Sequence, residues 1–137
     1  MSYQSFEQVL QKCHTEEKEF WRVILEDDMA ERNVSEEDSM EHMRATWDAM
    51  LLAAATYEGN LNSSSGLVGG DGRRMEEYIR SAQTKSLCGE YVDTCIAGAL
   101  QMGESNACMK RIVAAPTAGA CGVLPAVLVP YFQKRCK

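Results

Sequence analysis

Apolar side chains recur every three or four residues along most of this sequence, and this spacing limits the possible folds more than any other feature. It is the spacing of one face of an α-helix, which has about 3.6 residues per turn. The segments that show it, with their expected ends, are 3–13, 16–32, 36–58, 73–82, 87–103 and 122–135. The sequence therefore predicts an all-α fold, and a chain of 137 residues is expected to form a single helical domain over residues 1–137.

Several residues also predict where the helices end and how they pack. Thr15 is expected to cap the second helix, because its side chain can accept a hydrogen bond from a free N–H of the first turn. Ser35 and Asp38 have the spacing of a capping box at the start of the third helix, and Gly59 is its expected stop. In the fifth helix, the small residues around Gly98 predict a closely packed neighbour.

Residues 112–126, with the sequence IVAAPTAGACGVLPA, interrupt the helical pattern with small residues. Gly119 and Gly122 are free to take positive φ, so backbone N–H groups can approach a ligand closely. Cys121 lies just before the expected last helix, where the helix dipole favours the thiolate. Such a thiolate can act as a nucleophile or bind a soft metal, and the alternative is a buried structural cysteine in a tight turn.

Residues 63–72, SSSGLVGGDG, form a second stretch of small residues, with three hydroxyl groups and four glycines. Hydroxyls and flexible backbone amides before a helix can bind a carboxylate or a phosphate. The stretch is not a Walker A loop, because the GKS/T ending is missing. Leu67 and Val68 in its middle indicate a loop that packs, and the alternative is a flexible linker.

Six cysteines, at positions 13, 88, 95, 108, 121 and 136, do not show the CxxC spacing of a zinc finger or a thioredoxin-type site. No signal-peptide pattern follows Met1, and no apolar run approaches the roughly 20 residues of a membrane span. We therefore expect a cytoplasmic protein with reduced thiols. Cys88 and Cys95 would share one face of the fifth helix, where they could form a thiolate pair or, as we favour, pack in the core.

The net charge of −6 is unevenly distributed along the sequence. Residues 1–62 contain 14 acidic and 5 basic residues, whereas residues 63–137 contain 6 acidic and 9 basic residues. The half with the two small-residue stretches is therefore better suited to a small anion, such as an amino-acid carboxylate. The sequence lacks the basic, aromatic-rich surface of a nucleic-acid-binding protein, and the acidic half is typical of solvated helices.

The two small-residue stretches also resemble the motifs of a known family. SSSGLVGGDGRRM at residues 63–75 is followed by NACM at 106–109 and then by IVAAPTAGACGVLPA. In this order they resemble the N-terminal portion of the α subunit of bacterial iron–sulfur-dependent L-serine dehydratases. The resemblance covers about residues 63–131, and residues 1–62 fit it in helical character. It implies an all-α domain with two glycine-rich active-site loops.

The resemblance further implies an activity and a cofactor. The family converts L-serine to pyruvate and ammonia, a step of amino-acid degradation and gluconeogenesis, and uses a [4Fe–4S] cluster as Lewis acid on the serine hydroxyl. By this resemblance Cys121 is a cluster ligand, and the residues that bind the substrate are Ser63, Ser64, Ser65, Asn106, Thr117, Ala118 and Gly119. It also places the other cluster ligands outside this chain and the α-proton base in a β domain or β subunit.

The chain alone is therefore expected to be inactive. The implied partners are L-serine and a β domain or β subunit in an oligomer, without nucleic acid or membrane. Three alternatives stay open at this point. One is a related iron–sulfur lyase, such as a cysteine desulfidase, and another is a non-catalytic helical module that binds an amino acid. The third is a helical interaction domain, which the acidic first half would suit. The resemblance assigns no role to Cys88, Cys95, Cys108 or Cys136.

Overall fold

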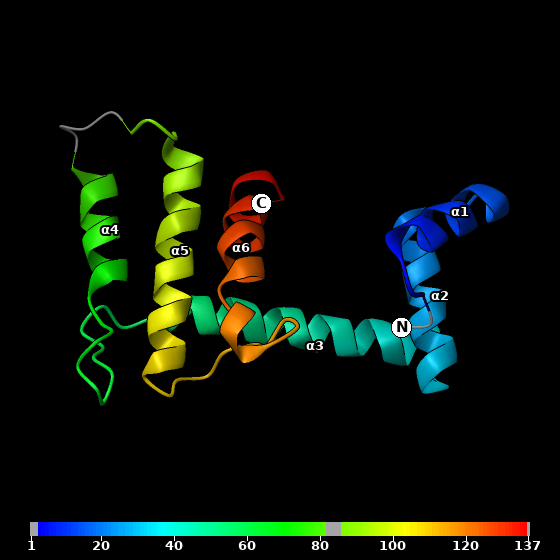
Figure 1. The fold of residues 1–137 in the computed structure, drawn as a ribbon, viewed down its shortest axis with the longest axis horizontal. Coiled ribbons are helices and arrows are strands. Elements are labelled where there is room, and N and C mark those ends of the chain that lie inside the picture. The colour runs from blue at the N-terminus through cyan, green and yellow to red at the C-terminus, as the bar shows by residue number, and fades with distance from the viewer. Residues whose placement is uncertain (1–2, 82–85, 137) are drawn as a thin grey trace. The chain divides into compact units, whose positions relative to one another are not determined.

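The computed structural model describes residues 3–81 and 86–136 (Figure 1). This part of the chain contains six α-helices, one short 3₁₀ helix and no strand, which confirms the all-α prediction. The helices are α1 (Phe6–Glu16), α2 (Phe20–Arg32), α3 (Glu36–Ala55), α4 (Asp71–Arg80), α5 (Glu90–Ala107), η1 (Ala118–Ala120) and α6 (Val123–Arg135). No helix in the described residues is long and apolar enough to cross a membrane.

The chain packs as two compact units, Met1–Thr46 and Trp47–Lys137, and the boundary between them lies within α3. The expected single domain over residues 1–137 stays a prediction.

The first unit contains α1, α2 and the beginning of α3. Its most deeply buried side chain is Val23 of α2, which has 0% exposure. The predicted capping box at the start of α3 is confirmed. The backbone N–H of Asp38 donates to Ser35 Oγ over 3.1 Å, and the N–H of Ser35 donates to Asp38 Oδ2 over 3.3 Å. Two orphan donors at the start of α3 are satisfied in this way.

The predicted boundary between the first two helices is wrong. Thr15 does not cap α2 but lies inside α1, where its hydroxyl donates to the Gln11 carbonyl over 2.8 Å. Helix α1 instead continues to Glu16, and its C-cap residue Glu17 adopts the left-handed conformation. Helix α2 then begins at Phe20. A serine or threonine can bond its own helix backbone as readily as it can cap the next helix, so sequence alone did not decide between the two roles.

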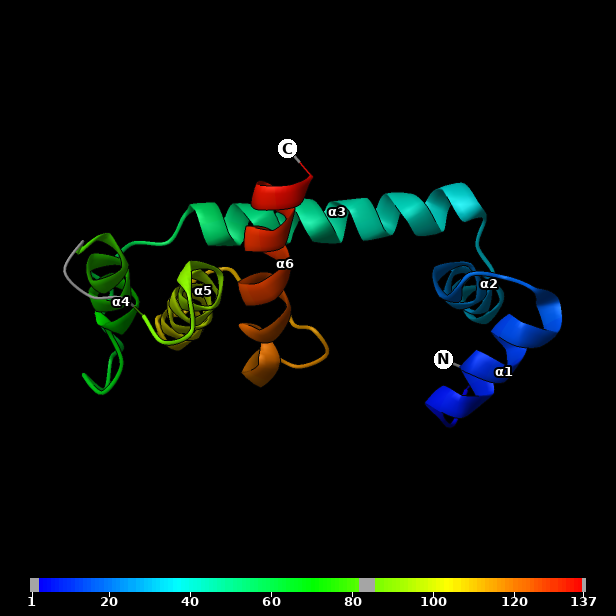
Figure 2. The same cartoon turned by 90° about the horizontal axis from the view of Figure 1, so that it is seen from above.

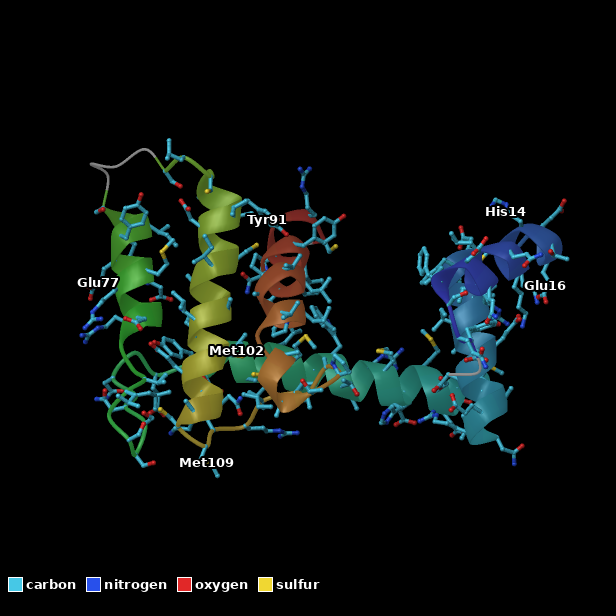
Figure 3. The ribbon with its side chains drawn as sticks, in the orientation of Figure 1. His14, Glu16, Glu77, Tyr91, Met102 and Met109 are labelled. Atoms are coloured by element: carbon cyan, nitrogen blue, oxygen red, sulfur yellow. The ribbon has the colours of Figure 1, made fainter. Side chains whose placement is uncertain are left out.

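In the second unit, α4 packs beside α5 and α5 packs beside α6 (Figures 1 and 2). The predicted close neighbour of Gly98 is α6, because a Cβ at Gly98 would lie 3.3 Å from Ala126 Cα. Tyr91 projects from α5 toward α6 (Figure 3), and its hydroxyl donates to the Val127 carbonyl over 3.0 Å. Small residues and one hydrogen bond thus join α5 to α6.

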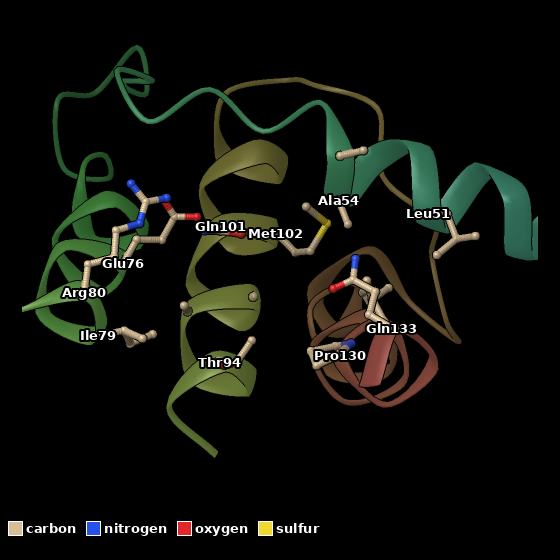
Figure 4. Close-up of a pocket in the computed structure, with 15 residues that line it drawn as sticks. Leu51, Ala54, Glu76, Ile79, Arg80, Thr94, Gln101, Met102, Pro130 and Gln133 are labelled. Atoms are coloured by element: carbon tan, nitrogen blue, oxygen red, sulfur yellow. Dashed lines mark hydrogen bonds and ion pairs between the residues drawn. The ribbon is translucent and has the colours of Figure 1, made fainter. Parts of the chain in front are cut away.

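The end of α3 within the second unit also packs against this group of helices. The Trp47 ring contacts the Phe132 ring of α6 edge-on, with 5.5 Å between the ring centroids. A cavity of about 360 Å³ remains between α3 and the other helices of the unit (Figure 4). Leu51 and Met102 line its apolar part, and Glu76 accepts a hydrogen bond from Gln101 Nε2 over 2.7 Å at its polar side.

Four predicted helix ends in this unit are displaced. Helix α3 ends at Ala55, so Gly59 is not its stop; a Cβ at Gly59 would instead meet the Arg73 side chain at 3.1 Å. Helix α4 begins at Asp71 rather than at residue 73. Helix α5 begins at Glu90 rather than at residue 87 and ends at Ala107 rather than at residue 103, so Asn106 belongs to its last turn.

Candidate active site

The loop between α5 and α6 brings several of the predicted site residues together. Thr117 caps η1, and its Oγ1 accepts from the backbone N–H of Ala120 over 3.3 Å. Asn106, at the end of α5, donates from Nδ2 to the Ala118 carbonyl over 3.1 Å. Thr117, Ala118 and Gly119 are exposed and Asn106 is half-buried. The predicted substrate-binding residues of this loop are therefore close together and accessible from solvent.

Cys121 lies directly before the N-cap of α6, as expected, but its environment differs from the predicted one. Its side chain is 2% exposed, and its Sγ donates to the Met102 carbonyl of α5 over 3.8 Å. Burial raises the pKa of the Cys121 thiol above its ordinary value. The direction is opposite to the one expected from the helix terminus, because desolvation of the buried thiol is the largest cause of the shift.

The two glycines of this loop do not adopt unusual backbone angles, and one of them, Gly122, allows close packing. Neither Gly119 nor Gly122 belongs to the residues with positive φ, so the conformational freedom expected of them is not used. A Cβ at Gly122 would lie 3.1 Å from the Ala99 carbonyl oxygen. Gly122 therefore lets the start of α6 approach the backbone of α5.

An open groove of about 430 Å³ begins at this loop and continues between α5 and α6. Asn106, Gly119 and Cys121 contribute to its wall. Most of the remaining wall is apolar, and several of its side chains are exposed: Val92 (42%), Ile96 (41%), Val123 (62%) and Val127 (49%). Cys121 and the exposed Gly119 of the loop thus line the same groove, together with Cys95 of α5.

The second loop, residues 63–70, is closed by its own hydrogen bonds. The N–H of Ser63 donates to the Val68 carbonyl over 2.8 Å, and the N–H of Val68 donates to Ser63 Oγ over 3.1 Å. Ser63 Oγ and Ser65 Oγ lie 3.1 Å apart, and Ser64 and Ser65 are exposed. The loop is ordered by polar contacts, not by the predicted packing, because Leu67 is 88% exposed.

The structure reveals a buried carboxylate that the sequence reasoning missed. Glu104 of α5 is 2% exposed, and its Oε1 accepts hydrogen bonds from the backbone N–H groups of Asp71 and Gly72, the latter over 3.1 Å. Its Oε2 accepts from the Tyr57 hydroxyl over 2.5 Å. Burial and this hydrogen bond raise the pKa of Tyr57. A signal was present: Glu104 is the acidic residue two positions before Asn106, in a mainly apolar and small-residue stretch from 95 to 107.

The cysteines of the described residues do not form a complete metal site. No group of three or more His, Cys, Asp or Glu side chains in residues 3–81 and 86–136 is arranged to bind a metal. Cys88 is exposed and precedes α5, so the predicted shared face with Cys95 is wrong. Cys121 and Cys95 of α5 both line the groove between α5 and α6, so two thiols of this wall are available to a soft metal.

Comparison with known proteins agrees with the motifs in both loops. The family model for the serine dehydratase alpha chain matches residues 15–137. This chain belongs to that family. Over 131 residues the chain is 30% identical to the L-serine dehydratase alpha chain of Peptoniphilus asaccharolyticus, with 93% of this chain and 43% of the relative covered. No solved structure shows a significant match.

Two further relatives have related names. The probable L-serine dehydratase alpha chain of Bacillus subtilis is 33% identical over 112 residues, with 82% of this chain and 37% of the relative covered. The L-serine dehydratase of Haemophilus influenzae is 30% identical over 139 residues, with 96% of this chain and 29% of the relative covered. The chain thus spans less than half the length of each of these relatives.

Proposed function

We propose that this chain is the catalytic α part of an L-serine dehydratase, which converts L-serine to pyruvate and ammonia in the cytoplasm. The observation that carries the proposal is the loop at residues 117–121. The Ala118 carbonyl of this loop accepts a hydrogen bond from Asn106. Asn106, Gly119 and the buried Cys121 line one groove between α5 and α6. This arrangement occurs in a chain of the serine dehydratase alpha chain family.

The exposed part of the loop is suited to binding the polar groups of an amino acid. Thr117, Ala118 and Gly119 offer a hydroxyl and backbone groups without bulky side chains in the way. Asn106 fixes the direction of the Ala118 carbonyl through its hydrogen bond. In the second loop, the exposed hydroxyls of Ser64 and Ser65 and the half-buried hydroxyl of Ser63 are further donors for a carboxylate.

The proposed reaction removes the α-proton and the β-hydroxyl of L-serine. The product is aminoacrylate, which tautomerises to an imine and is hydrolysed to pyruvate and ammonia. A [4Fe–4S] cluster, when bound, would supply a Lewis-acidic iron for the hydroxyl leaving group. Cys121 is the residue of this chain that we assign to it, and it must lose its thiol proton to serve as a ligand.

The remaining parts of the site are proposed to come from other polypeptide segments. Among the described residues Cys121 is the cysteine of the loop itself, and Cys95 of α5 lines the same groove. Further cluster ligands and the α-proton base would be supplied by the parts of the relatives that this chain does not match and by a β domain or β subunit. The isolated chain is then inactive and retains no stable cluster, because a cluster depends on its full set of thiolates.

Anaerobic reconstitution tests this proposal. The chain is purified alone and also co-expressed with the polypeptides that complete the α and β parts, and both samples are assayed for iron, sulfide and pyruvate formation. We expect pyruvate from L-serine, and less product from L-cysteine, in the complete assembly alone. A complete assembly that prefers L-cysteine, or that binds serine without turnover, would contradict the proposed reaction. A full cluster with turnover in the isolated chain would contradict the need for a second polypeptide.

A further inference from the structure

The buried carboxylate of Glu104 connects the two candidate substrate-binding segments. It lies on α5, two residues before Asn106, and accepts from the N–H groups of Asp71 and Gly72 at the start of α4. Residues 63–70 run directly into that start of α4. Figure 1 shows the loop before α4 lying at the same end of the helical layer as the last turns of α5.

We propose that Glu104 is a positioning residue that fixes the loop of residues 63–70 relative to Asn106 and the loop at 117–119. The proposal rests on the proposed function, because both loops are assigned there to the binding of one substrate. Glu104 itself does not touch the substrate in this assignment. It acts through the backbone of α4 on one side and through α5 on the other.

The chemistry of the contact explains why a carboxylate stands at this position. The first N–H groups of a helix have no partner within the helix, and their dipoles favour a negative charge. One carboxylate oxygen therefore satisfies two orphan donors of α4, at Asp71 and Gly72, while the other accepts from Tyr57. Three hydrogen bonds compensate part of the cost of burying the charge.

Gly72 makes this contact possible. A Cβ at Gly72 would lie 2.8 Å from Gln101 Cγ, 2.8 Å from the Tyr57 hydroxyl oxygen and 3.2 Å from the backbone nitrogen of Gln101. The start of α4 therefore lies against α5 with no room for a side chain. The Glu104 side chain bridges this short separation, so its length and its acceptor atoms are both required.

Three variants in the complete assembly separate positioning from simple stabilisation. Glu104→Ala removes all three hydrogen bonds, whereas Glu104→Gln keeps one acceptor oxygen for the two backbone donors. Val129→Ala is the matched control, because Val129 is 7% exposed in the same unit and is assigned no role in the site. Each variant is measured for Tm, for KM and kcat with L-serine, and for hydrogen exchange at the amides of Asp71 and Gly72.

We expect Glu104→Ala to raise KM for L-serine by about tenfold or more, with a smaller change in kcat, since misplaced binding groups weaken substrate binding first. Exchange at the Asp71 and Gly72 amides should become faster. Glu104→Gln should have a KM close to that of the wild type and should restore most of the protection of the two amides against exchange. Val129→Ala should lower Tm but leave KM and the exchange rates of both amides close to the wild-type values. If Glu104→Ala fails to fold, Tyr57→Phe removes one donor and is expected to give a smaller KM increase in the same direction.

Two results would overturn the proposal. One is the same KM for Glu104→Ala and Val129→Ala at a comparable loss of Tm. The other is unchanged protection of the Asp71 and Gly72 amides in Glu104→Ala. The amide measurement does not depend on turnover. A wild-type assembly that makes no pyruvate from L-serine therefore contradicts the proposed function, while exchange at these amides still decides whether Glu104 fixes the start of α4.

Discussion

Replacing Gly72 by alanine tests the close approach of α4 to α5 most directly. The added methyl would lie 2.8 Å from two atoms, Gln101 Cγ and the Tyr57 hydroxyl oxygen, which is too short for carbon contacts. Neither neighbour is free to move without loss. Gln101 donates to Glu76 over 2.7 Å, and Tyr57 donates to Glu104 over 2.5 Å. The clash therefore disturbs two hydrogen bonds as well as the packing.

The expected size of the effect follows from two opposing contributions. Overpacking of a tight contact costs about 1–3 kcal/mol. Alanine in place of glycine in a helix contributes up to about 1 kcal/mol in the opposite direction. The net loss for Gly72→Ala is then about 1–2 kcal/mol, which corresponds to about 3–10 °C in Tm for a chain of this size.

Gly103→Ala is the matched control, because Gly103 also lies in a helix of the second unit. Among the described residues outside its own turn of helix, no heavy atom lies within 4 Å of the position that its Cβ would take. This variant keeps the propensity gain without the clash, so it should be as stable as the wild type or more stable by up to about 1 kcal/mol.

Urea denaturation followed by circular dichroism at 222 nm measures both variants on the full chain. We expect the midpoint of Gly72→Ala to fall below that of wild type and the midpoint of Gly103→Ala to equal or exceed it, with similar slopes. Equal midpoints for the two variants would refute the reasoning. They would mean that α4 does not lie against α5 as closely as the structure shows.

Three further predictions concern the site and the first unit. Cys121→Ser should abolish the cluster absorption and the turnover of the complete assembly, while its helical circular dichroism signal should persist. A variant that keeps its cluster and its activity would show that Cys121 is not a cluster ligand. Replacing residues 64–65 by alanine should weaken serine binding with little change in Tm, because both hydroxyls are exposed, and titration calorimetry measures this. In the first unit, the Arg22 hydrogen bond and charge hold the pKa of Glu36 below its ordinary value of 4.5. That contribution to stability is present above the ordinary pKa and is lost as pH falls through the lowered one. Arg22→Gln should therefore weaken the acid dependence of stability below about pH 4.5, whereas Arg44→Gln should not, as acid titrations would show.

Much of the helical architecture could be predicted from the sequence because it depends on local information. The three-to-four spacing gave the correct helices, and the capping box at Ser35 forms as expected, since its atoms belong to one turn. Gly98 packs closely against α6, as its small neighbours indicated. The helix ends predicted at Thr15 and Gly59 were wrong. Thr15 makes a local hydrogen bond within α1 and Gly59 packs against Arg73, and the spacing of apolar residues gives no information about either contact.

The candidate site was less predictable because its decisive contacts join residues far apart in the sequence. The burial of Cys121 depends on α5, whose Met102 carbonyl accepts from the thiol, so a local helix-dipole argument gave the wrong direction for its pKa. The role of Glu104 depends on Asp71 and Tyr57, which are 33 and 47 positions away. A charged residue in an apolar helix marks such a position, but its partners follow only from the tertiary structure.

The last turns of α5 connect all the parts to which we assign a function. Met102 accepts from the Cys121 thiol, Glu104 accepts from the start of α4, and Asn106 donates to the Ala118 carbonyl. Met102 and Asn106 are four residues apart and lie on one face of α5, where the Met102 carbonyl and the Asn106 side chain both contact the loop between α5 and α6. Glu104 lies between them in sequence and on another side of the helix, where it reaches the start of α4. One segment of α5 is therefore the common support of the thiol, the exposed backbone of residues 117–119 and the serine-rich loop. Because five consecutive residues of one helix fix all three, a shift of this segment would displace the proposed metal ligand and both proposed substrate-binding loops together.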